Sequence, residues 1–469
     1  MLPSLTVFEP QPRIGFAWSI HSTVVRGGAG LFYDNYPGAL LDNYSENPPL
    51  DPSFTTETGT ISYASDPASL LANAAASDVG FENGFKAGES YNQIAASVPN
   101  FSAPSLAVAP NFPKVPQYQK WNLEIEQGFG PNTSFSIEYA GNHGIHILDQ
   151  NYGINGCNAT GTFASLPTCN ASGTGYNPSF AAVNYAESIG VASYNGVTVS
   201  FTHRYKSGQV EINYSYSHTL DDVSNSGEEP FSDADVGASN GSLLFPENPF
   251  DPQANYASAD QDIRHELTAN YVWELPIKRF LFFGHGPDRL LKGWDVNGFV
   301  QLRSGFPYSL TDSGTSSSLA NGGYDDEVFG TVLKAGGANF NCQTLGAMPS
   351  IANTALPNLN DCLNVNDYTG SPNGFGNVGR NTLRGPGYWN SDFSIMKHIP
   401  IAEGASLAIG AQFYNVFNHP NFQPAVGDTG NPNFGQVVGT VSPPTTVFGS
   451  FLGADASPRL IQVKLEASF

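Results

Sequence analysis

The chain has 469 residues, enough for two or three soluble domains or one large barrel, so length alone does not decide the fold. Charged residues make up 13% of it, about half of the roughly 25% usual in soluble globular proteins. The 41 acidic residues outnumber the 19 basic ones, and a formal net charge of −22 argues against a nucleic-acid partner, which requires a basic face. No apolar run approaches the roughly 18 residues of a membrane-spanning helix.

Eleven segments alternate apolar and polar residues with a period of two, which predicts strands with one apolar and one polar face. In chain order they are 12–20, 23–33, 117–129, 133–141, 194–205, 210–216, 265–275, 294–310, 389–398, 406–417 and 459–469. In the third, Trp121, Leu123 and Ile125 point one way while Glu124 and Glu126 point the other. The chain is therefore expected to be all-β.

The connections between these strands alternate between very short and very long. Tight turns are expected at 21–22, 130–132, 206–208 and 400–404, and a medium connection at 276–292. The long connections are 34–116, 142–192, 221–260, 311–385 and 418–458. Transmembrane β-barrels have short periplasmic turns and long extracellular loops, and aromatic residues at the ends of these strands fit the membrane interfaces.

The strand count also predicts that the chain is part of a larger barrel. Eleven is odd, and the first strand runs toward the side of the short turns. Bacterial single-chain barrels have even numbers of strands, so we expect further strands upstream of Met1. Residues 1–20 have no basic start and no apolar core, so no signal peptide is recognised there.

The four cysteines form two close pairs in sequence, Cys157 with Cys169 and Cys342 with Cys362. An even number of cysteines in local pairs predicts two disulfides, each within one long loop, in an oxidising compartment. A zinc site would require the closer CxxC type of spacing.

No nucleophile elbow, phosphate-binding loop, dinucleotide fingerprint or HExxH motif occurs, so we expect no enzyme activity, no catalytic or cofactor-binding residues and no cofactor. Three groups of side chains are candidate sites. His143 and His146 are a conceivable metal pair but fit a loop entrance better. The acids from Asp221 and Asp222 to Asp235, and Asp325 to Glu327, could collect Ca²⁺, but solvated loop acids are the favoured interpretation. Glu124, Glu126, Glu138 and Glu211 are expected to line the lumen as a hydrated wall, not as a glycosidase pair. No metal site is therefore predicted.

Several hairpins resemble those of one family of proteins. PRIGFAW and VVRGGAGLFYDNYP (12–37), QKWNLEIEQGFGPNTSFSIEYAGNHGIHI (119–147) and NTLRGPGYWNSDFSIMKHIPI (381–401) carry the likeness. Further counterparts are 194–222, 263–276, 291–310, 411–422 and the terminal strand. Together they resemble the Oar-like group of TonB-dependent outer-membrane receptors. The likeness covers most strands and little of the long loops.

The resemblance implies a barrel of about 22 strands, of which this chain supplies about 11–12 C-terminal strands. Residues 1–469 would be a barrel-domain fragment without the plug, the TonB-interaction segment and the signal peptide. Its place would be the bacterial outer membrane. The parent receptor would import a nutrient such as a siderophore, glycan or peptide with TonB-transmitted energy. A plug-free porin and a surface adhesion protein are the alternatives.

The expected partners are outer-membrane lipid, the TonB system through the missing N-terminal parts, and an extracellular ligand that the sequence does not specify. The barrel-assembly machinery is expected to recognise the terminal strand. Ile461, Val463, Leu465 and Phe469 would form that assembly signal.

Overall fold

The computed structural model describes most strands and the ordered parts of the loops between them. The described residues are 9–34, 79–80, 82–97, 106–108, 114–151, 154–158, 168, 176–177, 183–223, 250–277, 286–310, 319–320, 333–334, 368–369, 378–402, 404–422, 424–427, 431–435, 437 and 459–468. Within these ranges, no helix is long and apolar enough to cross a membrane.

All eleven strands that the alternation predicts are present, and they form one continuous meander. They are β1 (Arg13–Ile20), β2 (Thr23–Tyr33), β4 (Gln117–Phe129), β5 (Thr133–Asn151), β7 (Val183–Tyr205), β8 (Gly208–Asp221), β10 (His265–Glu274), β11 (Trp294–Arg303), β17 (Tyr388–Ala402), β18 (Ala405–Tyr414) and β19 (Leu460–Ser468). Along this path each strand pairs antiparallel with the next. The prediction of an all-β antiparallel sheet is confirmed.

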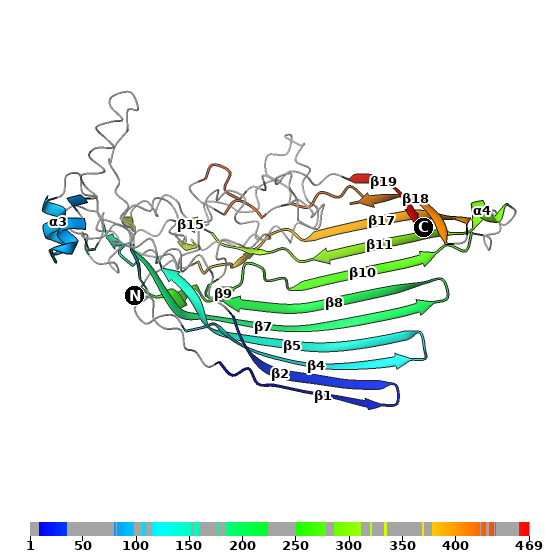
Figure 1. Cartoon of the computed structure of the whole chain (residues 1–469), viewed down its shortest axis with the longest axis horizontal. Coiled ribbons are helices and arrows are strands. Elements are labelled where there is room, and N and C mark those ends of the chain that lie inside the picture. The colour runs from blue at the N-terminus through cyan, green and yellow to red at the C-terminus, as the bar shows by residue number, and fades with distance from the viewer. Residues whose placement is uncertain are drawn as a thin grey trace, which may run out of the picture.

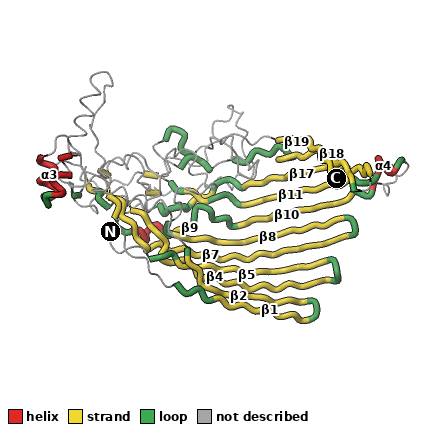
Figure 2. The backbone as a smooth tube through the Cα atoms, in the orientation of Figure 1, coloured by secondary structure: helices red, strands yellow, loops and turns green. Residues whose placement is uncertain are grey.

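The two ends of this sheet differ sharply. The hairpin turns of β1–β2, β4–β5, β7–β8 and β17–β18 all lie at one end, which we call the turn end (Figure 1). The long connections leave from the opposite end, which we call the loop end, as the tube drawing also shows (Figure 2). The C-terminus lies at the turn end, as the parity of the predicted strands requires (Figure 1).

Short elements complete the fold at the loop end. They are α3 (Tyr91–Ser97), β3 (Leu106–Val108), β6 (Cys157–Asn158), η2 (Pro252–Asn255), β9 (Ala257–Ser258), β12 (Pro307–Tyr308), β13 (Leu319–Ala320), β14 (Leu333–Lys334), β15 (Tyr368–Thr369) and β16 (Leu383–Arg384). The strand β3 pairs parallel with β7, and β9 pairs with β8, so both join the main sheet. A short helix, α4 (Asp288–Leu291), lies instead in the turn-end connection between β10 and β11.

The strand register places like residues side by side across the sheet. One row runs Trp18, Val25, Ile125, Ile137, Val199, Tyr214, Leu267 and Leu302 from β1 to β11. Many of these side chains are exposed, among them Ile125, Ile137 and Tyr214. The sheet therefore turns a broad apolar face outward, which suits contact with lipid.

The two edge strands are more exposed than the strands between them. Ile14 on β1 is 77% exposed and Ile461 on β19 is 59% exposed, whereas Ile137 on the central strand β5 is 43% exposed. Among the described residues, β1 pairs only with β2 and β19 only with β18, so the sheet is open at both edges. Lipid does not tolerate unpaired strand edges, so each edge requires a neighbouring strand.

Two central strands are much longer than the alternation predicts. β5 has 19 residues and β7 has 23, while a barrel strand needs only about 9–11 residues to cross the membrane. Their extra pairing follows register shifts near Gly144 and Ile147, where His146 takes a positive φ of 57°. Such bulges interrupt strict alternation, which explains why the sequence pattern ends early.

One predicted strand is instead too long in the sequence interpretation. The segment 294–310 leaves the sheet after Arg303, and β12 pairs with β16 in a separate small sheet. Gly305 marks the departure: a Cβ there would lie 2.0 Å from the carbonyl oxygen of Gly385. The chain therefore needs glycine to pass this close to the neighbouring backbone.

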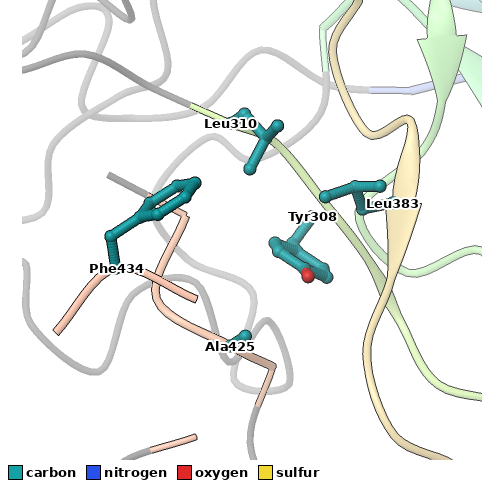
Figure 3. Close-up of a cluster of buried hydrophobic side chains, with 5 residues drawn as sticks. All are labelled: Tyr308, Leu310, Leu383, Ala425 and Phe434. Carbon is teal, nitrogen blue, oxygen red and sulfur yellow. The ribbon is translucent and has the colours of Figure 1, made fainter. Parts of the chain in front are cut away.

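A small apolar core lies among the loop segments. Tyr308, Leu310, Leu383, Ala425 and Phe434 are all buried and face one another (Figure 3). They come from β12 and the residue pair after it, from β16, and from the segments 424–427 and 431–435. The segments that follow β11, precede β17 and follow β18 are thus packed together.

Candidate functional site

The polar face of the sheet carries a row of paired charged and hydroxyl side chains. Arg26 donates to the two carboxylate oxygens of Glu124 at 2.6 and 2.8 Å, and its second contact is Glu126 at 3.2 Å. Farther along the same row, Thr198 and Ser215 share a hydrogen bond of 2.9 Å. Gln301 donates to Glu266 at 2.7 Å.

Glu124, Glu126 and Glu138 lie on this polar face, as predicted, and Glu211 lies there too. Asn122 donates to Glu138 at 3.2 Å, and Asn213 donates to Glu211 at 3.1 Å. An arginine and two amides donate to these carboxylates. This arrangement fits a hydrated wall.

A second polar assembly lies at the loop end. We call residues 255–262, 305–310, 380–387, 424–427 and 431–435 the loop-end cluster. Asp262 is its most deeply buried charge, with 0% of its surface exposed. Its carboxylate accepts hydrogen bonds from the backbone N–H of Thr219 at 2.7 Å and from Arg264 Nε at 2.8 Å. Arg384 donates to the same carboxylate and, at 2.7 Å, to the carbonyl oxygen of Asp262.

Arg380 makes a second set of contacts in the loop-end cluster. Its guanidinium donates to the Asp221 carboxylate at 2.5 Å and to the Asp260 carboxylate at 3.3 Å. It also donates to the carbonyl oxygens of Asn255 at 3.0 Å and Asp221 at 2.6 Å. One side chain thus ties the end of β8 to the segment that precedes β10.

Asn381 stands between the two arginines and connects a third segment. Its side-chain amide donates to Asp260 at 2.5 Å and to the carbonyl oxygen of Ser258 at 2.8 Å. Its backbone N–H donates to Ser309 Oγ at 2.9 Å. Asn381 has a positive φ of 54°, a conformation that asparagine tolerates better than most residues.

Burial and hydrogen bonding shift the pKa values of the acids in this region in opposite directions. Burial alone would raise the pKa of Asp262, but the donors from Thr219, Arg384 and Arg264 outweigh it and hold the pKa below its ordinary value. Burial raises the pKa of Asp222, although its carboxylate accepts a hydrogen bond from the backbone of Val191 at 2.7 Å. Asp262 therefore stabilises this region in its ionised form.

The expectation of solvated acids from Asp221 and Asp222 to Asp235 is wrong for Asp221 and Asp222, the two of these acids that the structure describes. Asp221, Asp222 and Asp260 are all buried, with exposures of 6%, 9% and 7%. Arginines that are distant in the sequence supply the compensating charge, which a local pattern does not reveal. Asp235, Asp325, Asp326 and Glu327 lie outside the described residues.

His143 and His146 both lie on β5, on either side of the start of its register shifts. In the described part of the chain, no group of three or more His, Cys, Asp or Glu side chains is arranged to hold a metal ion. His143 is paired in register with Gln119 of β4 and Ser193 of β7. The two histidines thus lie in the wall at the point where β5 extends beyond the predicted strand.

The predicted disulfides are only partly visible. Cys157 is fully buried and disulfide-bonded. Its predicted partner Cys169, and the second pair Cys342 and Cys362, lie outside the described residues, so the pairing stays a prediction. The segment that carries Cys157 pairs through β6 with Leu319 and Ala320 of β13, which joins two long loops.

The predicted assembly signal lies on the edge strand β19. Ile461, Val463 and Leu465 alternate on its apolar face and are strongly exposed, with Val463 at 75%. Phe469 lies outside the described residues.

Sequence reasoning missed the residues that build the loop-end cluster, above all Arg380 and Arg384. Both lie in or beside the motif NTLRGPG, which carries part of the family resemblance. The available signal was the presence of two arginines beside Asn381 and Gly385 in a chain that has few basic residues. Their partners at 221, 260 and 262 are more than 100 positions away in the sequence, with separations of 120 to 159 residues.

Comparisons with known proteins agree with this architecture. Residues 7–462 match the family model described as outer membrane beta barrel domain. No curated protein sequence matches the chain.

Solved structures similar to the chain include three outer-membrane proteins. The outer membrane transporter YddB from Escherichia coli has 11% identity, a TM-score of 0.41 and coverage of 98% of this chain and 40% of its own. The FrpB iron transporter from Neisseria meningitidis has 9% identity, a TM-score of 0.39 and coverage of 98% and 39%. The ferripyoverdine receptor of Pseudomonas aeruginosa has 9% identity, a TM-score of 0.38 and coverage of 98% and 32%. The chain spans two fifths or less of the length of these proteins.

Proposed function

Because the chain belongs to the outer membrane beta barrel domain family, we propose that it forms part of the wall and the outer loops of a TonB-dependent receptor that imports a nutrient. The chain lies in the bacterial outer membrane, with its apolar face toward lipid. The observation that carries the proposal is the meander of eleven strands whose short turns all lie at one end and whose long, partly folded connections lie at the other. Such a wall places binding loops outside the cell and a polar lining beside the transport path.

Strand direction supports a role for this chain as one portion of a larger barrel. β1 runs toward the turn end, and β19, antiparallel to β18, runs toward the turn end as well. Direct pairing of β1 with β19, within one chain or between two copies inserted the same way, would therefore be parallel. An antiparallel closure needs an odd number of additional strands. A barrel of about 22 strands satisfies this rule, and we place the plug and the TonB-interaction segment in the rest of the receptor.

The polar wall fits passage of a hydrated solute. Paired groups such as Arg26 with Glu124 leave a lining that is charged, hydrated and balanced locally. The ligand class that we propose is a siderophore, a glycan or a peptide, each of which is large and polar enough to require long outer loops.

We also propose that β19 is the segment by which the barrel-assembly machinery recognises the chain. A Leu465→Ser variant tests this, with Lys464→Ser on the polar face of the same strand as its control. We expect less folded, heat-modifiable barrel in the outer membrane for the first variant only. Equal yields for the two variants would contradict the role of the apolar alternation.

Uptake assays in the producing bacterium test the transport proposal. The probes are an iron-55-loaded siderophore, a fluorescent oligosaccharide and a fluorescent oligopeptide, each at low concentration. We expect deletion of the gene to abolish saturable uptake of one probe, and deletion of TonB to have the same effect. Uptake that persists without TonB and rises linearly with concentration would identify a porin-like channel. Normal uptake of all three probes with lost surface attachment would identify an adhesion protein.

A further inference from the structure

The segment 380–385 contacts every part of the loop-end cluster. On its polar side, Arg380 and Arg384 donate to Asp221, Asp260 and Asp262, which belong to or adjoin the ends of β8 and β10. Asn381 exchanges hydrogen bonds with Ser309 through both its backbone N–H and its side-chain oxygen. These contacts join the end of the β11–β17 loop to the start of the same loop and to the β8–β10 loop.

The apolar side of the same segment holds the last long loop. Leu383 packs into the apolar core with Ala425 and Phe434 (Figure 3). A Cβ on Gly385 would lie 3.0 Å from Pro424, and a Cβ on Gly427 would lie 2.3 Å from the carbonyl oxygen of Ser309. The chain after β18 therefore lies directly against this segment.

We propose that residues 380–385 act as a clasp that holds the described parts of three long outer loops together as one body at the mouth of the barrel. The three loops are those between β8 and β10, between β11 and β17, and after β18. This inference rests on the proposed function, since it assigns positioning residues to loops that would bind the nutrient. Arg380, Asn381 and Arg384 are positioning residues: they hold the loops, and the ligand need not touch them.

The geometry favours a clasp over three independently folded loops. The side chain of Arg380 is 13% exposed, and the side chains of its partners Asp221 and Asp260 are each 9% exposed. Charges this deeply buried are stable only when they are paired. Because Arg380 comes from the β11–β17 loop and both carboxylates come from the end of β8 and the β8–β10 loop, these two loops are stable only together.

The two arginines are expected to contribute unequally. Asp262 keeps Arg264 and the backbone N–H of Thr219 when Arg384 is removed. Arg380 binds two carboxylates, those of Asp221 and Asp260, and also the carbonyl oxygens of Asn255 and Asp221, so its removal deletes more contacts between the loops. Loss of Arg380 should therefore loosen the clasp more than loss of Arg384.

Hydrogen–deuterium exchange on the full chain in outer-membrane vesicles tests the clasp. The variants are Arg380→Gln, Arg384→Gln and their double variant. The matched control is Arg26→Gln, which removes ion pairs with Glu124 and Glu126 from the wall and leaves the loops intact. We expect exchange in 305–310, 380–387 and 431–435 to rise at least about tenfold in the double variant, a change of 1.4 kcal/mol. Exchange in 117–141 and 194–216 should not change, and Arg26→Gln should leave all loop peptides at their original rate.

Three outcomes would overturn the clasp: no change in the double variant, a rise confined to 380–387, or an equal rise throughout the wall. An Arg384→Lys variant guards against a general folding defect. Because it keeps the positive charge, it should restore most of the protection from exchange that Arg384→Gln loses. If the exchange result holds while uptake proves independent of TonB, the clasp stands and the proposed function falls. If uptake depends on TonB while the loops exchange independently, the clasp alone is wrong.

Discussion

The wall of the barrel and the loop-end cluster are built in opposite ways. In the wall, backbone pairing between neighbouring strands supplies the order, and large apolar side chains such as Ile137 stay exposed toward lipid. In the loop-end cluster, a small apolar core around Leu383 lies beside buried charges, of which Asp262 is the most deeply buried. The wall therefore needs only a repeating pattern, whereas the cluster needs particular partners brought together from distant segments.

The largest effect should come from removing the central charge of the loop-end cluster. Asp262→Ala leaves Arg384 and Arg264 without their shared carboxylate, and breaking a buried ion pair costs about 3–5 kcal/mol. We expect the loops to become sensitive to an added protease while the barrel stays resistant. Asp262→Asn, which keeps an acceptor for Thr219, should have a smaller effect. Loss of the folded barrel in Asp262→Ala would show that wall and cluster are not separable.

A charge on the apolar face should harm the wall and spare the cluster. Ile137→Arg places a cation on the lipid-facing side of β5, in the half of the strand nearer the turn end, and an arginine facing lipid costs up to about 2–4 kcal/mol at the bilayer midplane. Chemical unfolding in lipid vesicles measures this loss. Ser136→Arg is the control, because its side chain points to the polar face beside Glu126. Equal destabilisation by both variants would contradict the assignment of the two faces.

A single added methyl group should distinguish the cluster from the wall. Gly305→Ala places a Cβ 2.0 Å from the Gly385 carbonyl oxygen and forces backbone movement, for which overpacking suggests about 1–3 kcal/mol. In Gly15→Ala on β1, the nearest atom would be 3.5 Å away. Protease sensitivity of the loops should rise in the first variant only. Tolerance of Gly305→Ala would mean that β12 and β16 are not closely packed.

Acid should loosen the loop-end cluster before it affects the wall. The pKa of Asp262 lies below its ordinary value of 3.8, so its ionised form adds stability that is fully present above that value. The contribution is lost as the pH falls through the lower pKa of the folded state. We expect loop exchange, corrected for intrinsic rates, to rise as the pH falls below that ordinary value. A flat profile below that value would contradict the role of the ionised Asp262.

The smallest effect should come from Asp222, whose pKa is raised by burial. A raised pKa means that ionisation opposes folding, so the group favours the folded state at low pH and disfavours it as the pH rises through its folded value. Asp222→Asn keeps an acceptor for the Val191 N–H and removes the charge. We expect a gain of less than about 1 kcal/mol at neutral pH, measured by loop exchange. A loss would show that the Asp222 charge is needed.

The same contrast explains what the sequence could predict. Every strand of the wall was identifiable from alternation, because lipid on one side and water on the other impose a period of two on each strand. The alternation predicts too long a strand at 294–310. Apolar residues continue through 304–310, although the chain leaves the sheet near Gly305. It stopped short on β5 and β7, where bulges near His146 break the period while pairing continues.

The loop-end cluster could not be found in this way. Its members are ordinary loop residues until folding places Arg380 beside Asp221 and Arg384 beside Asp262. No local spacing encodes such pairs. The motif around 381–387 carried the family resemblance, and its physical role became visible only with the strand ends in place.

The central claim, that the wall separates lipid from a polar interior, is tested most directly on β7. Nitroxide labels on single cysteines introduced at 197–202 report oxygen access, which is high in lipid, and access of a water-soluble nickel complex, which is high in water. We predict high oxygen access at Val197, Val199 and Phe201 and high nickel access at Thr198, Ser200 and Thr202. Equal access at all six positions, or the opposite alternation, would contradict the assignment of this chain to a membrane barrel wall.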